Sequence, residues 1–400
     1  MKKLIEQWKY ELMASVIMLA YLIYYIPKLT DVTAWTIMPY ALSYRLGFIS
    51  RGLIGSFIRL LIPNLTCKHI YIIILINIVL LCWLTLYFMH KILKRAYDED
   101  ITGIIFLLGL FLVNPGSVAF LFYWGNFGRF DMFLLMTLFV TALFVIYDKC
   151  VWLVPALCIG AVMTHQAFVF QYFPAVLILL FYSGFILKRT YGKSIFIVTL
   201  ISTCAMFLYM QFFSRINYSY EDTMAIIDAT TDLPAEFFKK DMMVKTEYYS
   251  SVIETFIPFV WETLGRNLIK STAYVIFLIP MIKILRDIWK RFVQSRKSVL
   301  CKFFPWFVLL AELPMFVLTC DYGRDYAAIV LCNFILIFSL YVLGDAGMKK
   351  GVTDLTADLK KNPCKYVFVL VLCAVIGKFQ AAEVGELGDR LYALLTMLIE

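Results

Sequence analysis

Charged residues are scarce in this chain of 400 amino acids: Asp, Glu, Lys and Arg make up 16% of it, against 62% for hydrophobic residues. Soluble domains typically carry about 25% charged residues. The mean hydropathy of +0.81 points the same way. This balance excludes a soluble globular protein and predicts an all-α, polytopic integral membrane protein.

The chain also lacks the motifs by which many soluble enzymes bind nucleotides or metals. It contains no P-loop, HExxH, GxSxG, dinucleotide fingerprint or EF-hand spacing. None of its ten cysteines forms a CxxC pair, and several lie inside apolar runs, as buried small hydrophobic residues do. We therefore expect no cofactor and no metal site built from cysteine, with a divalent cation left open.

The net charge of +9 would suggest nucleic acid as the partner of a soluble protein, but its placement here indicates membrane topology instead. Basic residues gather in alternate loops, near 91–95, 149, 188–193, 283–302 and 349–365. Short loops rich in Lys and Arg stay in the cytoplasm. We therefore expect a cytoplasmic amino terminus and no nucleic-acid partner.

Apolar runs long enough to cross a bilayer number about eleven. They cover residues 10–27, 69–90, 101–123, 130–147, 151–164, 166–186, 194–213, 267–285, 303–320, 326–344 and 365–380. The pair at 151–186 could instead be two broken or re-entrant pieces.

The whole chain, 1–400, is predicted to be a single membrane domain with three recognisable parts. Residues 1–27 are predicted to form an uncleaved signal-anchor helix. Residues 28–68 form an outer loop with an interfacial helix, and residues 214–266 form an outer cap segment over a cavity that opens outward.

The stretch from Tyr44 to Arg59 places three arginines among glycines and bulky apolar residues. From Gly52 to Leu61 the apolar residues recur at helical spacing, which predicts a short amphipathic helix in the interface plane. A guanidinium binds phosphate through a planar fork, so Arg45 and Arg51 are candidates to bind a lipid-linked phosphate. Alternatively, the arginine side chains only extend toward lipid headgroups. We expect this of Arg59, so activity should tolerate Arg59→Lys.

Two short turns at the predicted outer face carry ionisable residues where a span begins. One covers residues 126–131 (NFGRFD) and the other residues 321–326 (DYGRDY). Ionisable residues at membrane depth are costly and by default mark a site with a partner nearby. Either each Arg pairs with the Asp of its own turn and caps a helix, or both turns form one site. We favour the shared site, whose candidate residues are Asn126, Arg129, Asp131, Asp321, Arg324 and Asp325.

Three further residues on the predicted outer face are candidates. His165 and Gln166 stand between two short apolar runs, and a histidine suits the role of base or phosphate-binding cation because its ordinary pKa is near neutrality. Alternatively, His165 is a hydrogen-bonded packing residue. Asp31, early in the first outer loop, could deprotonate an acceptor hydroxyl, which is the step that an inverting sugar transfer requires from the protein.

These features resemble bacterial envelope-polysaccharide enzymes, namely the GT-C type glycosyltransferases and the Wzy-like O-antigen or capsule polymerases, which use polyprenyl-phosphate-linked sugars on the outer face. The GT-C pattern implies an Asp, often followed by Glu, in the first outer loop; Asp31 is the only match and lacks the neighbouring acid. The Wzy-like pattern implies outward arginines, sometimes with a histidine. The matches by type and side are Arg45, Arg51, Arg129, Arg324 and His165.

The resulting hypothesis is an enzyme of the bacterial inner membrane that transfers a sugar or oligosaccharide from a polyprenyl carrier. Its partners would be the lipid-linked glycan and membrane lipids. The arginines named above would bind the phosphate, and Asp31, Asp131, Asp325 or His165 would supply the base. A transporter or flippase for lipid-linked oligosaccharide, and a non-catalytic scaffold of a polysaccharide assembly complex, are the alternatives.

Overall fold

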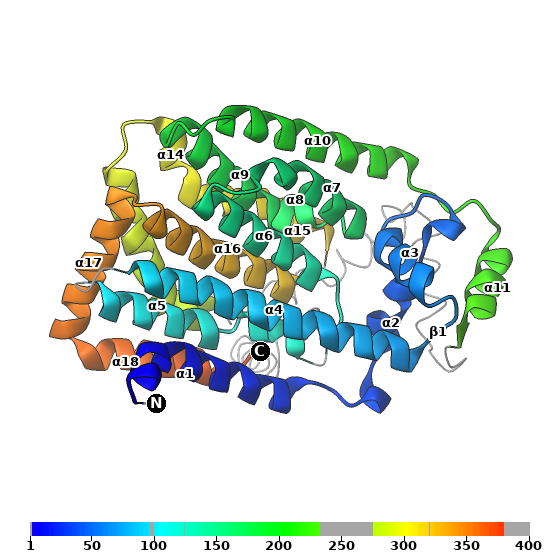
Figure 1. Cartoon of the computed structure of the whole chain (residues 1–400), viewed down its shortest axis with the longest axis horizontal. Helices are drawn as coiled ribbons and strands as arrows, with labels where there is room; N and C mark the ends of the chain where they lie inside the picture. The colour runs from blue at the N-terminus through cyan, green and yellow to red at the C-terminus, as the bar shows by residue number, and fades with distance from the viewer. Residues whose placement is uncertain (1, 97–99, 124, 233–274, 320, 380–400) are drawn as a thin grey trace, which may run out of the picture.

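The computed structural model describes residues 2–96, 100–123, 125–232, 275–319 and 321–379. Nearly all of the regular structure in these ranges is helical, and the helices run side by side in an elongated bundle (Figure 1). The two strands, β1 (Leu65–Thr66) and β2 (Thr231–Asp232), pair in parallel and are two residues long each. The all-α prediction is confirmed.

Four helical stretches in the described ranges are long and apolar enough to cross a membrane: α4 (Cys67–Arg95), α5 with η3 (Ile101–Phe122), α10 (Gly192–Phe213) and α16 (Tyr322–Val342). Six more apolar stretches are only 10–17 residues long. They contain α3 (Gly52–Leu61), α6 (Asp131–Tyr147), α7 (Val154–Thr164), α9 (Phe173–Phe181), α15 (Phe304–Leu318) and α18 (Pro363–Val375). A membrane protein is therefore supported, but the predicted count of about eleven spans is not confirmed.

Of the remaining helices, α1 (Lys2–Tyr25) is long and packs along the side of the bundle against α4 and α5, and the others are shorter. The others are η1 (Leu29–Asp31), α2 (Ala34–Ala41), η2 (Tyr44–Leu46), η4 (Val151–Leu153), α8 (Phe168–Gln171), η5 (Tyr182–Ile186), α11 (Tyr220–Thr230), α14 (Val299–Lys302) and α17 (Ala346–Lys361). A helix also covers residues 275–294.

Proline interrupts the apolar run at 101–123. The α5 helix ends at Val113, and η3 begins at Val118. The break between them contains Pro115, which has no backbone N–H to donate. The buried Lys378 ammonium donates to the carbonyls of Val113 and Asn114, at 2.9 Å each, and to the Ser117 hydroxyl at 2.8 Å. These carbonyls lack partners within the helix because they lie at its end. A lysine from the far end of the sequence thus closes the break.

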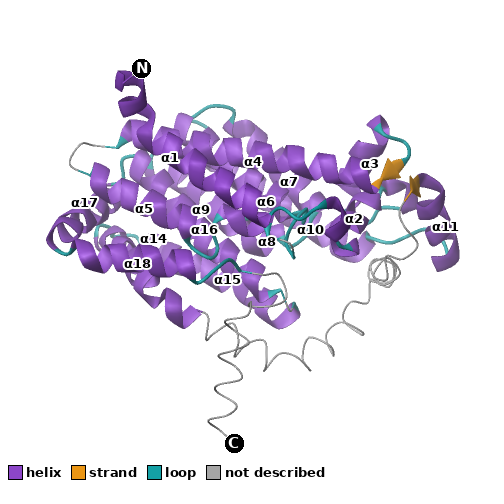
Figure 2. Ribbon diagram, turned by 90° about the horizontal axis from the view of Figure 1, so that it is seen from below, coloured by secondary structure: helices purple, strands orange, loops and turns teal. Residues whose placement is uncertain are grey.

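The bundle has two different ends. The amino terminus and α17 lie at one end, and α3, α11 and the β1–β2 pair lie at the other, the end where residues 28–68 meet residues 214–232 (Figures 1 and 2). Backbone hydrogen bonds of 2.8 Å join Arg215 to Phe48 and Asn217 to Leu46. The rest of the predicted cap segment, from residue 233, lies outside the described residues.

Helix α3 is close to the predicted interfacial helix in its bounds and lies against α2. A Cβ atom at Gly55 would lie 1.8 Å from the Leu42 carbonyl oxygen and 2.7 Å from that of Tyr40, so the contact requires glycine.

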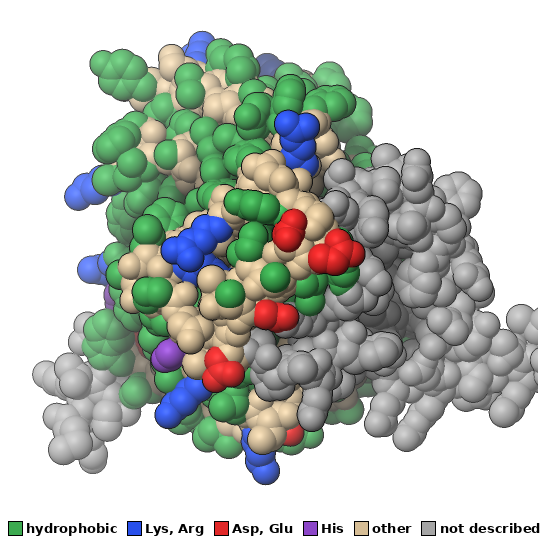
Figure 3. Space-filling model, turned by 90° about the vertical axis from the view of Figure 1, so that its right-hand side faces the viewer, with side chains coloured by type: hydrophobic (Ala, Val, Ile, Leu, Met, Phe, Trp, Pro, Cys, Tyr) green, Lys and Arg blue, Asp and Glu red, His purple; other side chains and the backbone are tan. Residues whose placement is uncertain are grey.

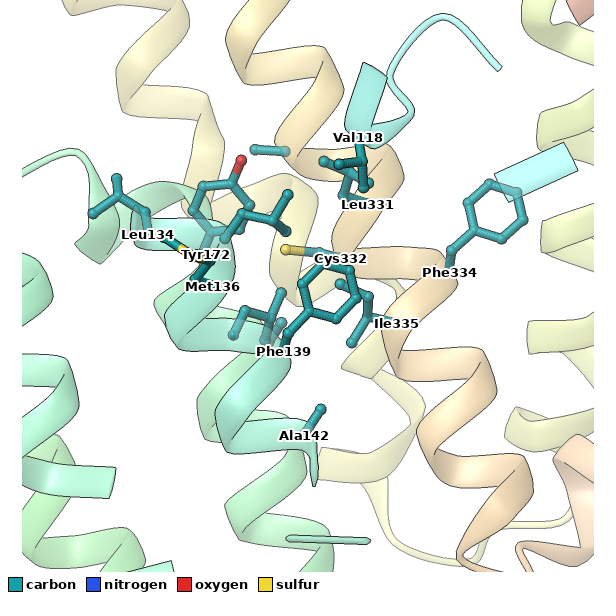
Figure 4. Close-up of a cluster of buried hydrophobic side chains, with 14 of the residues drawn as sticks. Val118, Leu134, Met136, Phe139, Ala142, Tyr172, Leu331, Cys332, Phe334 and Ile335 are labelled. Atoms are coloured by element: carbon teal, nitrogen blue, oxygen red, sulfur yellow. The ribbon is translucent and has the colours of Figure 1, made fainter. Parts of the chain in front are cut away.

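The apolar core sets the relative position of α6 and α16. Figure 4 shows Phe139 of α6 next to Cys332 and Ile335 of α16, all of them buried. Side chains packed at this density leave little freedom for one helix to slide along the other. The first turns of α6 and α16, which carry the charged residues, are therefore held side by side.

Candidate functional site

The two turns predicted at the outer face lie in contact, and the arginine of each turn binds an aspartate of the other. Arg324 binds Asp131 of the other turn, with Nε and Nη2 at 3.0 and 2.9 Å from Oδ1, and it also binds Asp321 of its own turn. Arg129 reaches across to Asp321, Nη1 to Oδ2, at 3.2 Å. We call these four residues the charged cluster. The alternative in which each turn is closed only by its own Arg and Asp is wrong.

Helix ends position the acids of the cluster. Asp131 is the first residue of α6 and Asp321 is the N-cap of α16, where a carboxylate is stabilised by the positive end of the helix dipole. Burial acts to raise the pKa of Asp321, but Arg129 and Arg324 outweigh it and hold that pKa below its ordinary value. Asp321 is therefore an anion that fixes both guanidinium groups.

His165 lies at the edge of the charged cluster as the C-cap of α7, with Nε2 at 3.4 Å from Arg324 Nη2. Burial, followed by the charges of Arg51, Arg324 and Arg129, lowers the pKa of His165 well below its ordinary value, so the ring is neutral. Its Nδ1 accepts the backbone N–H of Ala167 at 3.2 Å, which leaves the ring proton on Nε2. Two donors, Nε2–H and Nη2–H, then face each other and are arranged to share an anionic oxygen.

The three arginines of the 44–59 stretch have three different surroundings. Arg51 is the N-cap of α3 with φ at 64°, and its charge acts on His165, Arg129 and Asp321, which places it beside the cluster. Arg45 is exposed in η2, and its charge acts on Arg59.

Arg59 corrects one expectation. Its side chain does not extend toward headgroups but is buried, 6% exposed, with Nη2 donating to the Ala41 carbonyl at 2.9 Å and Nη1 to the Thr230 carbonyl at 3.4 Å. Sequence spacing could not show this, because the acceptors belong to α2 and α11. Arg59 thus connects α3 to both neighbours and has a structural role.

Three other predicted residues lie in contacts of a different kind. The Asn126 amide donates to the carbonyls of Phe120 and Phe379, each at 3.0 Å, and so holds the backbone near the cluster. Gln166 accepts from Gln211 of α10 at 2.8 Å. Asp31 lies in the exposed η1, where Thr30 donates to it at 3.0 Å. Their predicted roles in binding or catalysis stay predictions.

A second layer of polar groups lies beneath the cluster. Asp325, in the first turn of α16, accepts from Gln171 at 3.2 Å and from Thr319 at 3.3 Å. Glu312 is fully buried beside Asp325, and Tyr172 is fully buried near Glu312. Gln171, Tyr172, Glu312 and Thr319 were not among the predicted site residues. The available signal was a polar residue inside an apolar run, and it was clearest for Glu312, the one acid in the run at 303–320.

The surface at this end of the bundle is mixed in charge. Figure 3 shows Lys and Arg side chains alongside Asp and Glu side chains among hydrophobic and polar atoms. Within the described ranges, no group of three or more His, Cys, Asp and Glu side chains is arranged to hold a metal ion. No family model, no curated protein and no solved structure matches the chain.

Proposed function

We propose that this protein is a bacterial inner-membrane enzyme that transfers a sugar or oligosaccharide from a polyprenyl phosphate or pyrophosphate to a glycan hydroxyl at the outer face. One observation carries the proposal: the guanidinium groups of Arg129 and Arg324 meet at the Asp321 carboxylate, and the neutral His165 ring lies against Arg324, at the end of the apolar bundle where α3 lies. In this orientation the amino terminus and α17 are cytoplasmic, in line with the basic loops.

The charged cluster suits a departing phosphate. Arg324 and Arg129 are held in place by Asp131 and Asp321 before any substrate binds. Their positive charges and N–H donors therefore need no reorganisation as negative charge develops on the leaving oxygen. His165 Nε2–H supplies a third donor. Arg51, at the start of α3, is near enough to act on the same charge.

Asp131 is the best-placed base among the candidates. Its Oδ1 binds Arg324, while the buried Oδ2 has no hydrogen-bond partner among the described residues. In the reaction, the acceptor hydroxyl passes its proton to Oδ2 as its oxygen bonds to the anomeric carbon. The bond from that carbon to the phosphate oxygen breaks, and the electron pair leaves with the phosphate.

Replacing Arg324 by lysine tests the proposal. Lysine keeps the charge but loses the planar fork that binds Asp131 and Asp321 together. Loss of a buried charge-assisted contact costs about 2–5 kcal/mol, so we expect Arg324→Lys to reduce polymer formation by native membranes at least about 30-fold, at unchanged protein level. The matched control is Arg286→Lys, at an exposed arginine of the helix 275–294. Full activity of Arg324→Lys would refute the phosphate-binding role.

A transporter or flippase is the second candidate, because α5 breaks inside the bundle and broken helices form substrate sites in many transporters. The carbonyls at the break are already bound by Lys378. Polymer formation by purified protein in detergent, where there is no membrane to cross, distinguishes an enzyme from a transporter.

A further inference from the structure

Glu312 lies where an acid is hardest to accommodate. It sits in the middle of α15, a helix of mainly apolar residues that packs against α16, α8 and α9. Its side chain is 0% exposed, and neither carboxyl oxygen has a hydrogen-bond donor among the described residues. An ionised carboxylate in such a place would be strongly destabilising, so some compensating group must be present.

The charged and titratable groups facing Glu312 identify that compensation. Asp325 and Arg324 face it from α16, and Asp131 faces it from α6; Tyr172, between α8 and α9, lies within electrostatic reach of both Glu312 and Asp131. The Arg324 guanidinium is already used, since it binds Asp131 and Asp321. Glu312 therefore shares its surroundings mainly with another acid.

Asp325 is in a similar position. It is fully buried, and the donors to its two oxygens, Gln171 and Thr319, are both neutral. Two neighbouring carboxylates offer only acceptors to each other, so their contact becomes a hydrogen bond only if one of them carries a proton. Adjacent buried carboxyl groups cannot both ionise and commonly share a proton.

We propose that Glu312 and Asp325 form a buried proton-binding site that holds one proton at rest and takes up a second from Asp131 during each turnover. The buried Tyr172 side chain lies within electrostatic reach of Asp131 and Glu312. Its hydroxyl binds neither carboxylate in the resting structure, and it connects them when it moves onto them during turnover, because a hydroxyl can accept and donate a proton at once. The take-up from Asp131 rests on the function proposed above, whereas the shared proton does not.

The proton balance of the step is simple. The proton that leaves the acceptor hydroxyl passes from Asp131 through the Tyr172 hydroxyl to Glu312, and the proton that the pair already shares moves onto Asp325. The pair is then fully protonated, and Asp131 is again a carboxylate beside Arg324. The departing phosphate keeps the electron pair of the broken bond. Release of one proton to water returns the pair to its resting state.

Infrared spectroscopy of the purified full-length protein in detergent tests the resting proton. We expect the wild type to show the C=O stretching band of a protonated carboxylic acid at neutral pH, shifted in D2O. Glu312→Gln, which has the shape of the protonated acid, should fold and lose this band. Asp148→Asn, at an exposed acid paired with Arg189, should keep it. A wild type without the band, a band that persists in Glu312→Gln, or a band removed by added sodium would each overturn the proposal.

The pH profile of polymer formation by membranes tests the take-up. Activity should fall at acidic pH, where the pair is fully protonated and accepts no further proton. In Glu312→Gln the lone Asp325 carboxylate loses its acidic neighbour and holds protons less tightly. The acid limb should therefore move to lower pH by about one unit or more. An unchanged limb in Glu312→Gln overturns the take-up, since a purely structural role would change the rate and not the limb. If the protein forms no polymer at all, both the proposed function and the take-up from Asp131 fail. The infrared result still decides whether Glu312 and Asp325 share a proton.

Discussion

Lys378 illustrates how one side chain can complete a helix at a distance in sequence. Each of its three ammonium protons has an acceptor in the break after α5, and the nearby Tyr21 ring lies 4.5 Å from Nζ. This lysine lies inside the apolar run predicted at 365–380, and its role could not be predicted because hydropathy averages over the residues that surround a charge.

Removing the Lys378 ammonium should destabilise the bundle. In Lys378→Met the Val113 carbonyl loses the donor shown for it, while the Asn114 carbonyl keeps the Ser117 N–H at 3.0 Å. A buried carbonyl without a partner costs about 1–3 kcal/mol. We expect a clearly lower melting temperature in detergent, measured by tryptophan fluorescence. Lys360→Met, at an exposed position of α17, serves as the control and should melt with the wild type. Equal melting of the two variants would show that the break needs no lysine.

At the scale of elements, the close contact of α3 with the 40–42 segment depends on Gly55. In Gly55→Ala the new methyl group would overlap two backbone carbonyl oxygens, so α3 and the adjoining Arg51 must shift. We expect lower stability and a loss of activity of at least about tenfold, because small displacements of binding groups are costly.

The control for that substitution is Gly160→Ala in the middle of α7, where a Cβ would meet nothing within 4 Å. It should be neutral or add up to about 1 kcal/mol of stability, since alanine favours helix over glycine. Thermal unfolding and polymer formation, measured on both variants, decide the matter. If the two alanines behave alike, the contact at Gly55 does not position α3.

Hydropathy predicted where the apolar helices lie but not how long they are. The run at 166–186 is divided among α8, α9 and the π-helical η5, in line with the expected broken pieces. The run at 101–123 breaks at Pro115. A hydropathy average counts apolar residues and does not depend on a missing N–H or on a change of helix type. It therefore overestimates the length of continuous helices.

Thiol labelling measures which end of the bundle faces the cytoplasm. Exposed Cys150 follows α6, and exposed Cys364 lies in the first turn of α18, next to α17. In right-side-out vesicles carrying Cys67→Ser, an impermeant maleimide should label Ala229→Cys on α11 from outside. The two native thiols should react only after permeabilisation. The opposite pattern would place the charged cluster in the cytoplasm and remove the basis for the proposed function.

The candidate site could be predicted in part. Residue type and membrane depth selected Arg129, Asp131, Asp321 and Arg324 correctly as neighbours at one end of the bundle. Which Arg pairs with which Asp was not predictable, because the exchange depends on the packing of α6 against α16, and many distant side chains determine that packing. Glu312 and Tyr172 depend on the same packing.

The exchange between the two turns also bears on how the chain is made. Asp131 and Arg324 are 193 positions apart in a chain of 400, so the ribosome adds nearly half of the protein after Asp131 before Arg324 exists. Until then Asp131 is accompanied by Arg129 of its own turn, whose charge also acts on it. Insertion of α16 adds Arg324, so a chain that stops before α16 lacks the guanidinium that binds Asp131 directly, and a costly buried acid is left less well compensated.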